Sequence, residues 1–182
     1  MLRRLLVALV VLVAADHALA GDKPAISART QLALTDQAAR AWSDDAVLIY
    51  AENDEDLDSE GRAVRWGLLY YSATKDRARG YSVNAQKIVV ANDLDFGLDA
   101  PPVRANWIDS DRALQAAEQE GGRKYREKHV GHVRSMLLVR GAFHEEKPDR
   151  TTWTLVYDAP DAPSYFVVVD AESGKVVRQW KG

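Results

Sequence analysis

The stretch Thr152-Trp153-Thr154-Leu155-Val156-Tyr157-Asp158, with the residues that follow it up to Trp180, indicates the fold most clearly. The large side chains of Trp153, Leu155 and Tyr157 recur at every second position, and Thr152, Thr154 and Asp158 share the other set of positions. This alternation is typical of a strand with one face in a core and the other toward water. The segment therefore predicts a half-buried strand.

A hairpin is predicted directly after this strand. Ser164-Tyr165-Phe166-Val167-Val168-Val169 is rich in β-branched and aromatic residues, and Lys175-Val176-Val177 resumes the pattern after a polar turn. In that turn, Asp170 can accept hydrogen bonds from its own backbone and Gly174 can adopt a positive φ. The chain is therefore expected to reverse between residues 170 and 174.

The beginning of the chain predicts a secretory signal peptide, residues 1–20. Met1-Leu2-Arg3-Arg4 is a short basic start, the apolar run from Leu5 to Ala15 follows, and Ala18-Leu19-Ala20 is a small-x-small cleavage site. The run is too short for a spanning helix, which needs roughly 20 apolar residues. We therefore expect a periplasmic or secreted protein with no membrane span in the mature chain.

Composition excludes several classes of partner and chemistry. The chain has 24 Lys and Arg against 27 Asp and Glu, and its net charge of −3 does not suit nucleic acid, which requires a basic face. It has no cysteine, so disulfides, thiolate catalysis, cysteine-ligated zinc and lipid attachment to a cysteine are excluded. An exported chain of this kind must be held together by its core.

Apolar periodicity predicts a helix over 26–42, with Ser27 as N-cap, and a second helix over 108–118, with Asp109 or Ser110 as N-cap. Gly121-Gly122 is expected to end the second helix. Strands are expected at 47–51, 62–71 and 133–139. A further strand is expected to begin at 81–85, and 87–90 either continues it or forms another strand. Residues 123–132 form a basic, irregular connection in this interpretation.

The same order of elements occurs twice along the chain. Each half has a helix, a strand, a strand that begins with tryptophan and a strand that begins with tyrosine, so that Trp66, Leu68, Tyr70 and Tyr81 correspond to Trp153, Leu155, Tyr157 and Tyr165. This order predicts a duplication. The predicted fold is α+β, with two tandem cystatin-like units that each pack one helix on a 3-4-stranded antiparallel sheet. The first unit would span 25–98, a linker 99–106 and the second unit 107–182.

The segment from Tyr165 to Val177 resembles the end of a PepSY domain, where an apolar strand leads into Asp-Ala-x-Ser/Thr-Gly and a short valine-containing strand. The resemblance implies a small cystatin-like fold in bacterial exported proteins. It also implies a domain that inhibits or binds, as in protease propeptides, and does not catalyse. Tyr81 to Val90 in the first half lacks the Asp-Ala-x-Ser-Gly turn.

Two groups of residues are candidates for metal binding. Asp56-Leu57-Asp58-Ser59-Glu60-Gly61 begins like an EF-hand loop but lacks the closing glutamate and leads into a strand, so a solvated loop from Glu52 to Gly61 is the better interpretation, with weak calcium binding left open. His129 and His132 could meet with His144 or Glu145 around a zinc ion, but their spacing matches no zinc motif, and surface histidines are expected.

Catalytic motifs are not found. The chain has no nucleophile elbow, phosphate loop or dinucleotide glycines, and Ser173 lies in a turn with no histidine near it in sequence. The basic run from Arg123 to Lys128 could contact an acidic partner or anionic lipid, although a solvated loop is favoured. No catalytic, cofactor or metal residue is therefore assigned.

The favoured function is that of an exported, non-catalytic binding protein whose partner is a peptide or protein of the cell envelope. It could restrain a protease, or it could accept an extended peptide at a sheet edge. The alternative is a small metal-independent hydrolase or isomerase with a pocket between helix and sheet. A buried carboxylate or histidine in a deep pocket would favour the enzyme, whereas a filled interface would favour binding.

Overall fold

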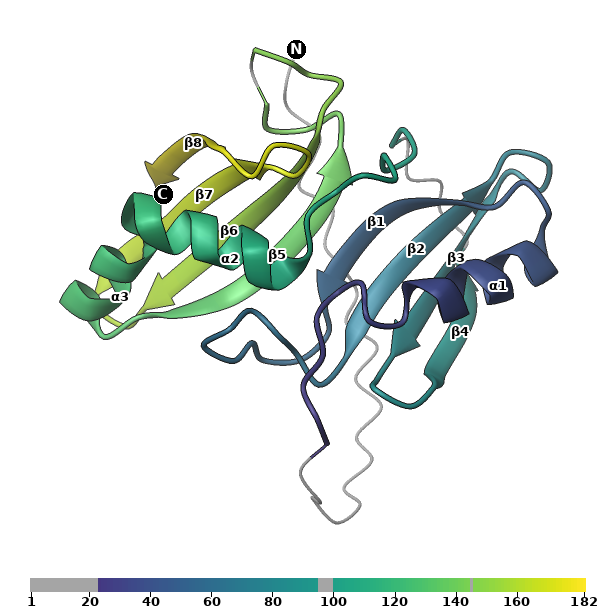
Figure 1. Cartoon of the computed structure of the whole chain (residues 1–182), viewed down its shortest axis with the longest axis horizontal. Helices are drawn as coiled ribbons and strands as arrows, with labels where there is room; N and C mark the ends of the chain where they lie inside the picture. The colour runs from purple at the N-terminus through teal and green to yellow at the C-terminus, as the bar shows by residue number, and fades with distance from the viewer. Residues whose placement is uncertain (1–22, 95–99, 145) are drawn as a thin grey trace.

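A computed structural model describes residues 23–94, 100–144 and 146–182 (Figure 1). The predicted signal peptide and Glu145 lie outside these ranges. None of the helices in the described part of the chain is long and apolar enough to cross a membrane. The elements are α1 (Leu32–Trp42), β1 (Val47–Asn53), β2 (Trp66–Ser72), β3 (Arg77–Val83), β4 (Ile88–Leu94), α2 (Ser110–Ala117), η1 (Glu118–Gly122), α3 (Arg123–His129), β5 (His132–Arg140), β6 (Thr151–Ala159), β7 (Ala162–Asp170) and β8 (Val176–Lys181).

The eight strands form one continuous antiparallel sheet in the order β4-β3-β2-β1-β5-β6-β7-β8. The join between the two halves is the pairing of β1 with β5, in which Tyr50, Ala51 and Glu52 face Val139, Leu138 and Leu137. The prediction of two tandem cystatin-like units, each with its own 3-4-stranded sheet, is therefore wrong. The physical reason is that β1 is apolar on both faces and would be a costly edge strand, so it pairs on both sides.

Both helical segments lie over the same face of this sheet, α1 over the half with β1–β4 and α2 over the half with β5–β8 (Figure 1). On β2 the side chains that face the helices are buried and those between them are only partly buried, which is the predicted alternation. A sheet of this kind buries one apolar face under helices.

The first helix is shorter than predicted, because residues 26–31 are held by other partners. Ile26 forms an isolated bridge with Ala63 through two backbone hydrogen bonds of 2.9 and 3.0 Å. The Ser27 hydroxyl, predicted to cap the helix, donates instead to Asp109 at 2.6 Å. The segment before α1 therefore ties the first helix to the start of the second.

The second helical segment runs from Ser110 to His129 and consists of two helices that meet at a kink. Asp109 is the N-cap as predicted, since its carboxylate accepts a hydrogen bond of 2.8 Å from the Ser110 N–H. Gly121-Gly122 ends the first of these helices, as predicted, because Gly121 has a φ of 137°, which is not helical, and the short turn η1 joins it there to the next helix. The predicted irregular region after it is the helix α3.

The bend exists because tyrosines from the sheet occupy the space beneath it. A Cβ atom on Gly122 would lie 2.2 Å from the Tyr157 hydroxyl, and one on Gly121 would lie 2.6 Å from the Tyr165 hydroxyl. Only glycine allows the helix to approach these rings so closely. Tyr125 of α3 then packs on both rings, at centroid distances of 6.2 Å to Tyr157 and 5.4 Å to Tyr165.

Three tryptophans form the centre of the core. Trp66 and Trp107 each meet Trp153 edge to face, with ring centroids 5.9 and 5.8 Å apart. The Trp66 and Trp153 N–H groups donate to the carbonyls of Ile26 and Ile108, both at 2.8 Å. These two hydrogen bonds satisfy the N–H groups of the buried Trp66 and Trp153 indoles.

Two of the proposed correspondences between the halves do not fit the strand register. Tyr81 pairs with Leu68, whereas Tyr165 pairs with Tyr157. The preceding strands also match in spacing, since Ile49 lies 17 residues before Trp66 and Leu138 lies 15 before Trp153. However, Ile49 lies in an irregularity of the β1–β2 ladder, whereas Leu138 pairs regularly with Trp153. Similar spacing in sequence therefore did not imply equal positions in the sheet.

Hydrogen exchange tests the continuity of the sheet. We expect the amides of Ala51 and Leu138 to exchange at least about 100-fold more slowly than outward amides of β8, because central strands open only with the whole domain. Exchange measured by NMR on the mature chain would show this. Fast exchange at Ala51 and Leu138 would mean that β1 and β5 are free edges.

Candidate functional site

The helix–sheet interface is filled with side chains. Trp66, Trp153 and Tyr157 are fully buried there, and Tyr70 is 1% exposed. The Tyr70 hydroxyl lies 3.0 Å from the Thr35 hydroxyl and donates to Asp36 at 2.6 Å, so α1 is fastened to the sheet at this point. The pocket that the enzyme alternative requires is not formed at these residues.

A surface hollow of about 320 Å³ lies between the loop at 59–62 and the second helical segment. Its charged side chains largely pair with one another. Arg126 binds both carboxylate oxygens of Glu118, and Arg62 lies 2.9 Å from Glu60. The hollow therefore offers little uncompensated charge to a ligand.

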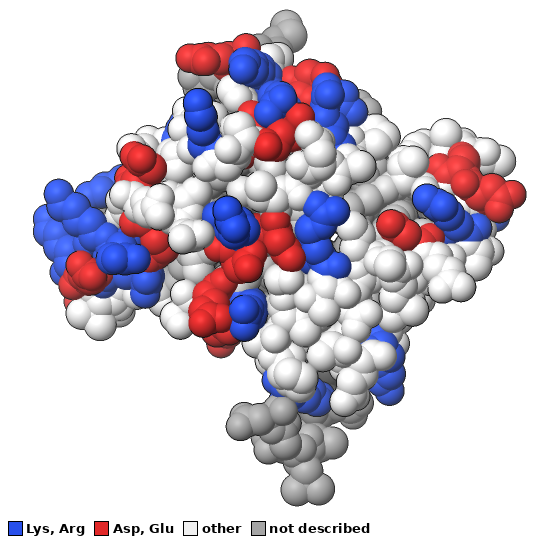
Figure 2. Space-filling model, in the orientation of Figure 1, with Lys and Arg blue, Asp and Glu red and all other residues white. Residues whose placement is uncertain are grey.

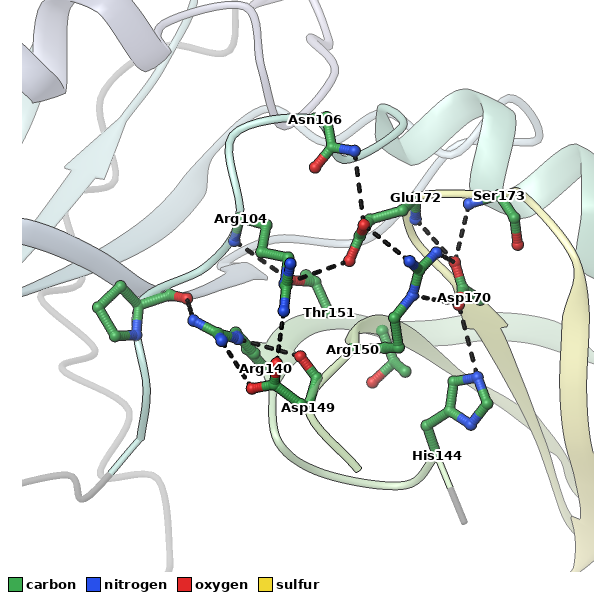
Figure 3. A network of polar contacts seen from close by, with 12 residues as sticks. Arg104, Asn106, Arg140, His144, Asp149, Arg150, Thr151, Asp170, Glu172 and Ser173 are labelled. Atoms are coloured by element: carbon green, nitrogen blue, oxygen red, sulfur yellow. Dashed lines mark hydrogen bonds and ion pairs between the residues drawn. The ribbon is translucent and has the colours of Figure 1, made fainter. Parts of the chain in front are cut away.

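A polar network centred on Asp170 joins the β7–β8 turn to two other segments of the chain (Figure 3). The Asp170 carboxylate accepts two hydrogen bonds of 2.8 Å from Arg150, and two from the backbone N–H groups of Glu172 and Ser173 at 3.0 and 2.8 Å. The Gly174 N–H donates to the Asp170 carbonyl, and Gly174 has a φ of 72°. The predicted mechanism of the hairpin turn is confirmed.

Electrostatics make Asp170 the anchor of this turn. Burial alone would raise the pKa of Asp170, but the hydrogen bonds from Arg150 and from the turn outweigh burial and hold the pKa well below its usual value. Asp170 is therefore ionised at neutral pH. Its charge is matched by the Arg150 guanidinium.

The histidine of this network was predicted to lie on the surface, and that prediction is wrong. The His144 side chain is 5% exposed, its Nε2 lies 3.5 Å from an Asp170 oxygen and its Nδ1 accepts a hydrogen bond of 3.2 Å from the Lys147 N–H. Its partner Asp170 lies on β7, far from His144 in sequence, so the burial of His144 could not be predicted from residues near it in the chain. The same turn binds the segment 104–106, because Glu172 lies 2.9 Å from Arg150, 3.6 Å from Arg104 and 3.5 Å from Asn106.

These contacts fix the start of β8, which is the last strand of the sheet order. The Gly182 N–H donates to the Ser164 carbonyl at 3.0 Å. In an antiparallel ladder, hydrogen-bonded pairs alternate with non-bonded pairs. With Phe166 facing Trp180 and Val167 facing Gln179, the backbone N–H and C=O of Gln179 and Lys181 therefore point away from β7.

Aromatic stacking braces the same strand. Trp180 lies flat on Phe166, with centroids 4.8 Å apart and an interplanar angle of 5°, and the Arg178 guanidinium lies 4.8 Å from the Trp180 ring centre. Trp180 could either dock on the sheet or be available to a partner. The structure shows it docked on β7 and still partly exposed.

The opposite edge of the sheet is β4. Its Asp93 is paired with Arg79 at 2.6 Å and lies 3.8 Å from Arg77, both on β3. Residues 95–99, which follow β4 directly, lie outside the described ranges.

The other predicted candidates are dispersed. His129 is on α3, His132 begins β5 and His144 is in the network, and among the residues that the structure describes no three histidine or acidic side chains are placed to hold a metal ion. In the acidic loop, Asp58 accepts hydrogen bonds from the Glu60 and Arg62 N–H groups, and calcium binding there stays a prediction.

Comparisons with known proteins support the fold alone. No protein-family model matches the chain, and no curated protein matches it. The crystal structure of a proposed lipoprotein from Clostridium difficile 630 is similar, with a TM-score of 0.56 and 13% sequence identity over 83% of this chain and 92% of that one. The PepSY resemblance therefore stays a prediction.

Replacing Asp170 tests the network. We expect Asp170→Asn to lower the free energy of unfolding at neutral pH by about 3 kcal/mol, because Arg150 loses a buried partner. The matched control is Asp149→Asn, whose exposed carboxylate also binds arginines and whose loss should destabilise the fold much less, because solvent screens an exposed ion pair.

The pH dependence gives a second readout of the same pair. A carboxylate with a depressed native pKa stabilises the fold fully above its unfolded-state pKa of about 3.9, and this contribution declines as the pH falls further. The difference between wild type and Asp170→Asn in urea unfolding should therefore shrink from about pH 5 to about pH 2. A difference that stays constant over this range would contradict the assignment.

Proposed function

We propose that this chain is an exported, non-catalytic binding protein that adds an extended segment of a partner protein to its sheet at β8. The observation that carries the proposal is the outward direction of the Gln179 and Lys181 backbone groups on a braced terminal strand. Such groups pair readily with another extended chain.

The filled interface between helices and sheet supports binding over catalysis. An enzyme of the alternative class would need a cavity with a free acid or base, but the buried Asp170 and His144 are engaged with each other, with Arg150 and with backbone groups. Their contacts organise the turn that leads into β8.

Export is supported by the N-terminal sequence pattern of residues 1–20. The structural neighbour, itself described as a proposed lipoprotein, agrees with a place in the cell envelope. Restraint of a protease stays a prediction within the same proposal, since an added strand is one way to hold a protease or its substrate.

A proline at the open edge tests strand addition. Gln179→Pro removes an outward N–H and leaves the bonds to β7, so edge strands accept it. The control is Gln179→Ala, which removes the same contact with the Tyr165 hydroxyl and keeps the N–H. Peptides of about ten residues selected from a random display library should bind wild type and the alanine variant, and lose at least about tenfold in affinity for the proline variant.

Melting temperatures of the two variants check that the fold is retained. Amide exchange should also show that a bound peptide protects Gln179 and Lys181. Equal affinity of the alanine and proline variants, or protection confined to other strands, would contradict the proposal.

A further inference from the structure

We infer that the segment accepted at β8 is acidic. This inference rests on the proposed function and specifies the chemistry of the partner. It is carried by the distribution of charge around the strand, in a molecule whose net charge is −3.

Strand β8 and the turn residues just before it carry basic residues and no acidic residue. Lys175, Arg178 and Lys181 are all exposed, and residues 173–182 include no Asp or Glu. Lys175 before the strand and Lys181 at its end discourage addition of a second copy of the same strand, because like charges near one another are unfavourable. They favour a strand of opposite charge.

The second helical segment adds to this positive region. Gly121 lies beside β8, since a Cβ atom there would be 3.5 Å from the Gln179 Oε1. Arg123, Lys124 and Lys128 follow on α3 and are exposed. Figure 2 shows Lys and Arg side chains gathered at the end of the molecule where Figure 1 places α3 and the C-terminus.

Nearby acids offset only part of this charge. Glu118 is already bound by Arg126, which leaves Asp111, Glu120 and Glu127 on the same segment. The opposite edge of the sheet differs, because the acidic Asp93 of β4 is neutralised by arginines of the neighbouring strand. The two ends of the sheet therefore present different charge to a partner.

The directions of the β8 side chains predict which positions of the added strand should be acidic. Gln179 and Lys181 project toward the helices, since the Tyr165 hydroxyl on that face bonds to Gln179, whereas Trp180 projects to the opposite face with Phe166. Successive side chains of a strand alternate between faces. Acidic side chains at every second position of the partner would lie between Lys181 and the first turn of α3.

An anionic membrane would meet the same cations, but it would leave the outward N–H and C=O groups of β8 without partners. A polypeptide satisfies both the charges and the backbone. The proposed partner is therefore an acidic peptide. Binding to an anionic lipid surface is the contrary result that the experiment can reveal.

The test uses three fluorescein-labelled peptides of alternating threonine with glutamate, glutamine or lysine. In fluorescence anisotropy with the mature chain, the glutamate peptide should bind about tenfold more tightly than the glutamine peptide at about 50 mM NaCl, and this advantage should largely disappear at about 300 mM because salt screens exposed charges. The lysine peptide should bind most weakly.

Charge reversal locates the effect. The variant with Lys175→Glu and Lys181→Glu should reverse the preference between the glutamate and lysine peptides. The control carries Lys75→Glu and Lys87→Glu, two exposed lysines in the half of the sheet formed by β1–β4, and should keep the wild-type preference.

The outcomes separate this inference from the proposed function. Equal binding of the glutamate and glutamine peptides, abolished for both by Gln179→Pro, would overturn the acidic partner and leave strand addition standing. Binding of phosphatidylglycerol vesicles that requires Lys175 and Lys181, with no peptide bound and no effect of Gln179→Pro, would overturn both.

Discussion

The pairing of β1 with β5 is the contact on which the rest of the molecule depends. It joins two runs of antiparallel strands into one sheet through three residue pairs, and it brings Trp66 and Trp153 into edge-to-face contact in one core. Among the residues that the structure describes, the resulting sheet has β4 and β8 as its edges. With β1 and β5 central, the places where another chain can add to the sheet lie at its two ends.

Local features of the fold could be predicted from sequence because their causes are local. The turn at 170–174 follows from an aspartate that bonds its own backbone and a glycine with a positive φ. The alternation at 152–158 predicted the strand β6 correctly, but the expected water-facing side is wrong, because Thr152 and Thr154 are buried as well. The continuity of the sheet depends on residues far apart in sequence. Its one sequence signal was the run Val47-Leu48-Ile49-Tyr50-Ala51, which is apolar on both faces and so belongs at the centre of a sheet.

The candidate site was harder to predict for the same reason. Asp170 was identified as a turn residue, but its ion pair with Arg150 and its contact with His144 require three segments to meet. The sheet order showed that β8 is an edge, and the hydrogen bond between Gly182 and Ser164 showed which backbone groups face outward. A short motif that matched a family ending thus described a turn correctly and the whole architecture incorrectly.

The links between the first and second helical segments have a consequence for cooperativity. Asp109 binds Ser27 and the Arg29 N–H, Arg29 stacks 4.4 Å over Trp107, and Trp107 packs on Trp153. Neither half can open without exposing indole surface that belongs to the other, so the chain should lose its structure in a single transition. A ligand bound at one edge of the sheet would consequently slow local unfolding at the opposite edge, with no change in the shape of the sheet between the two edges.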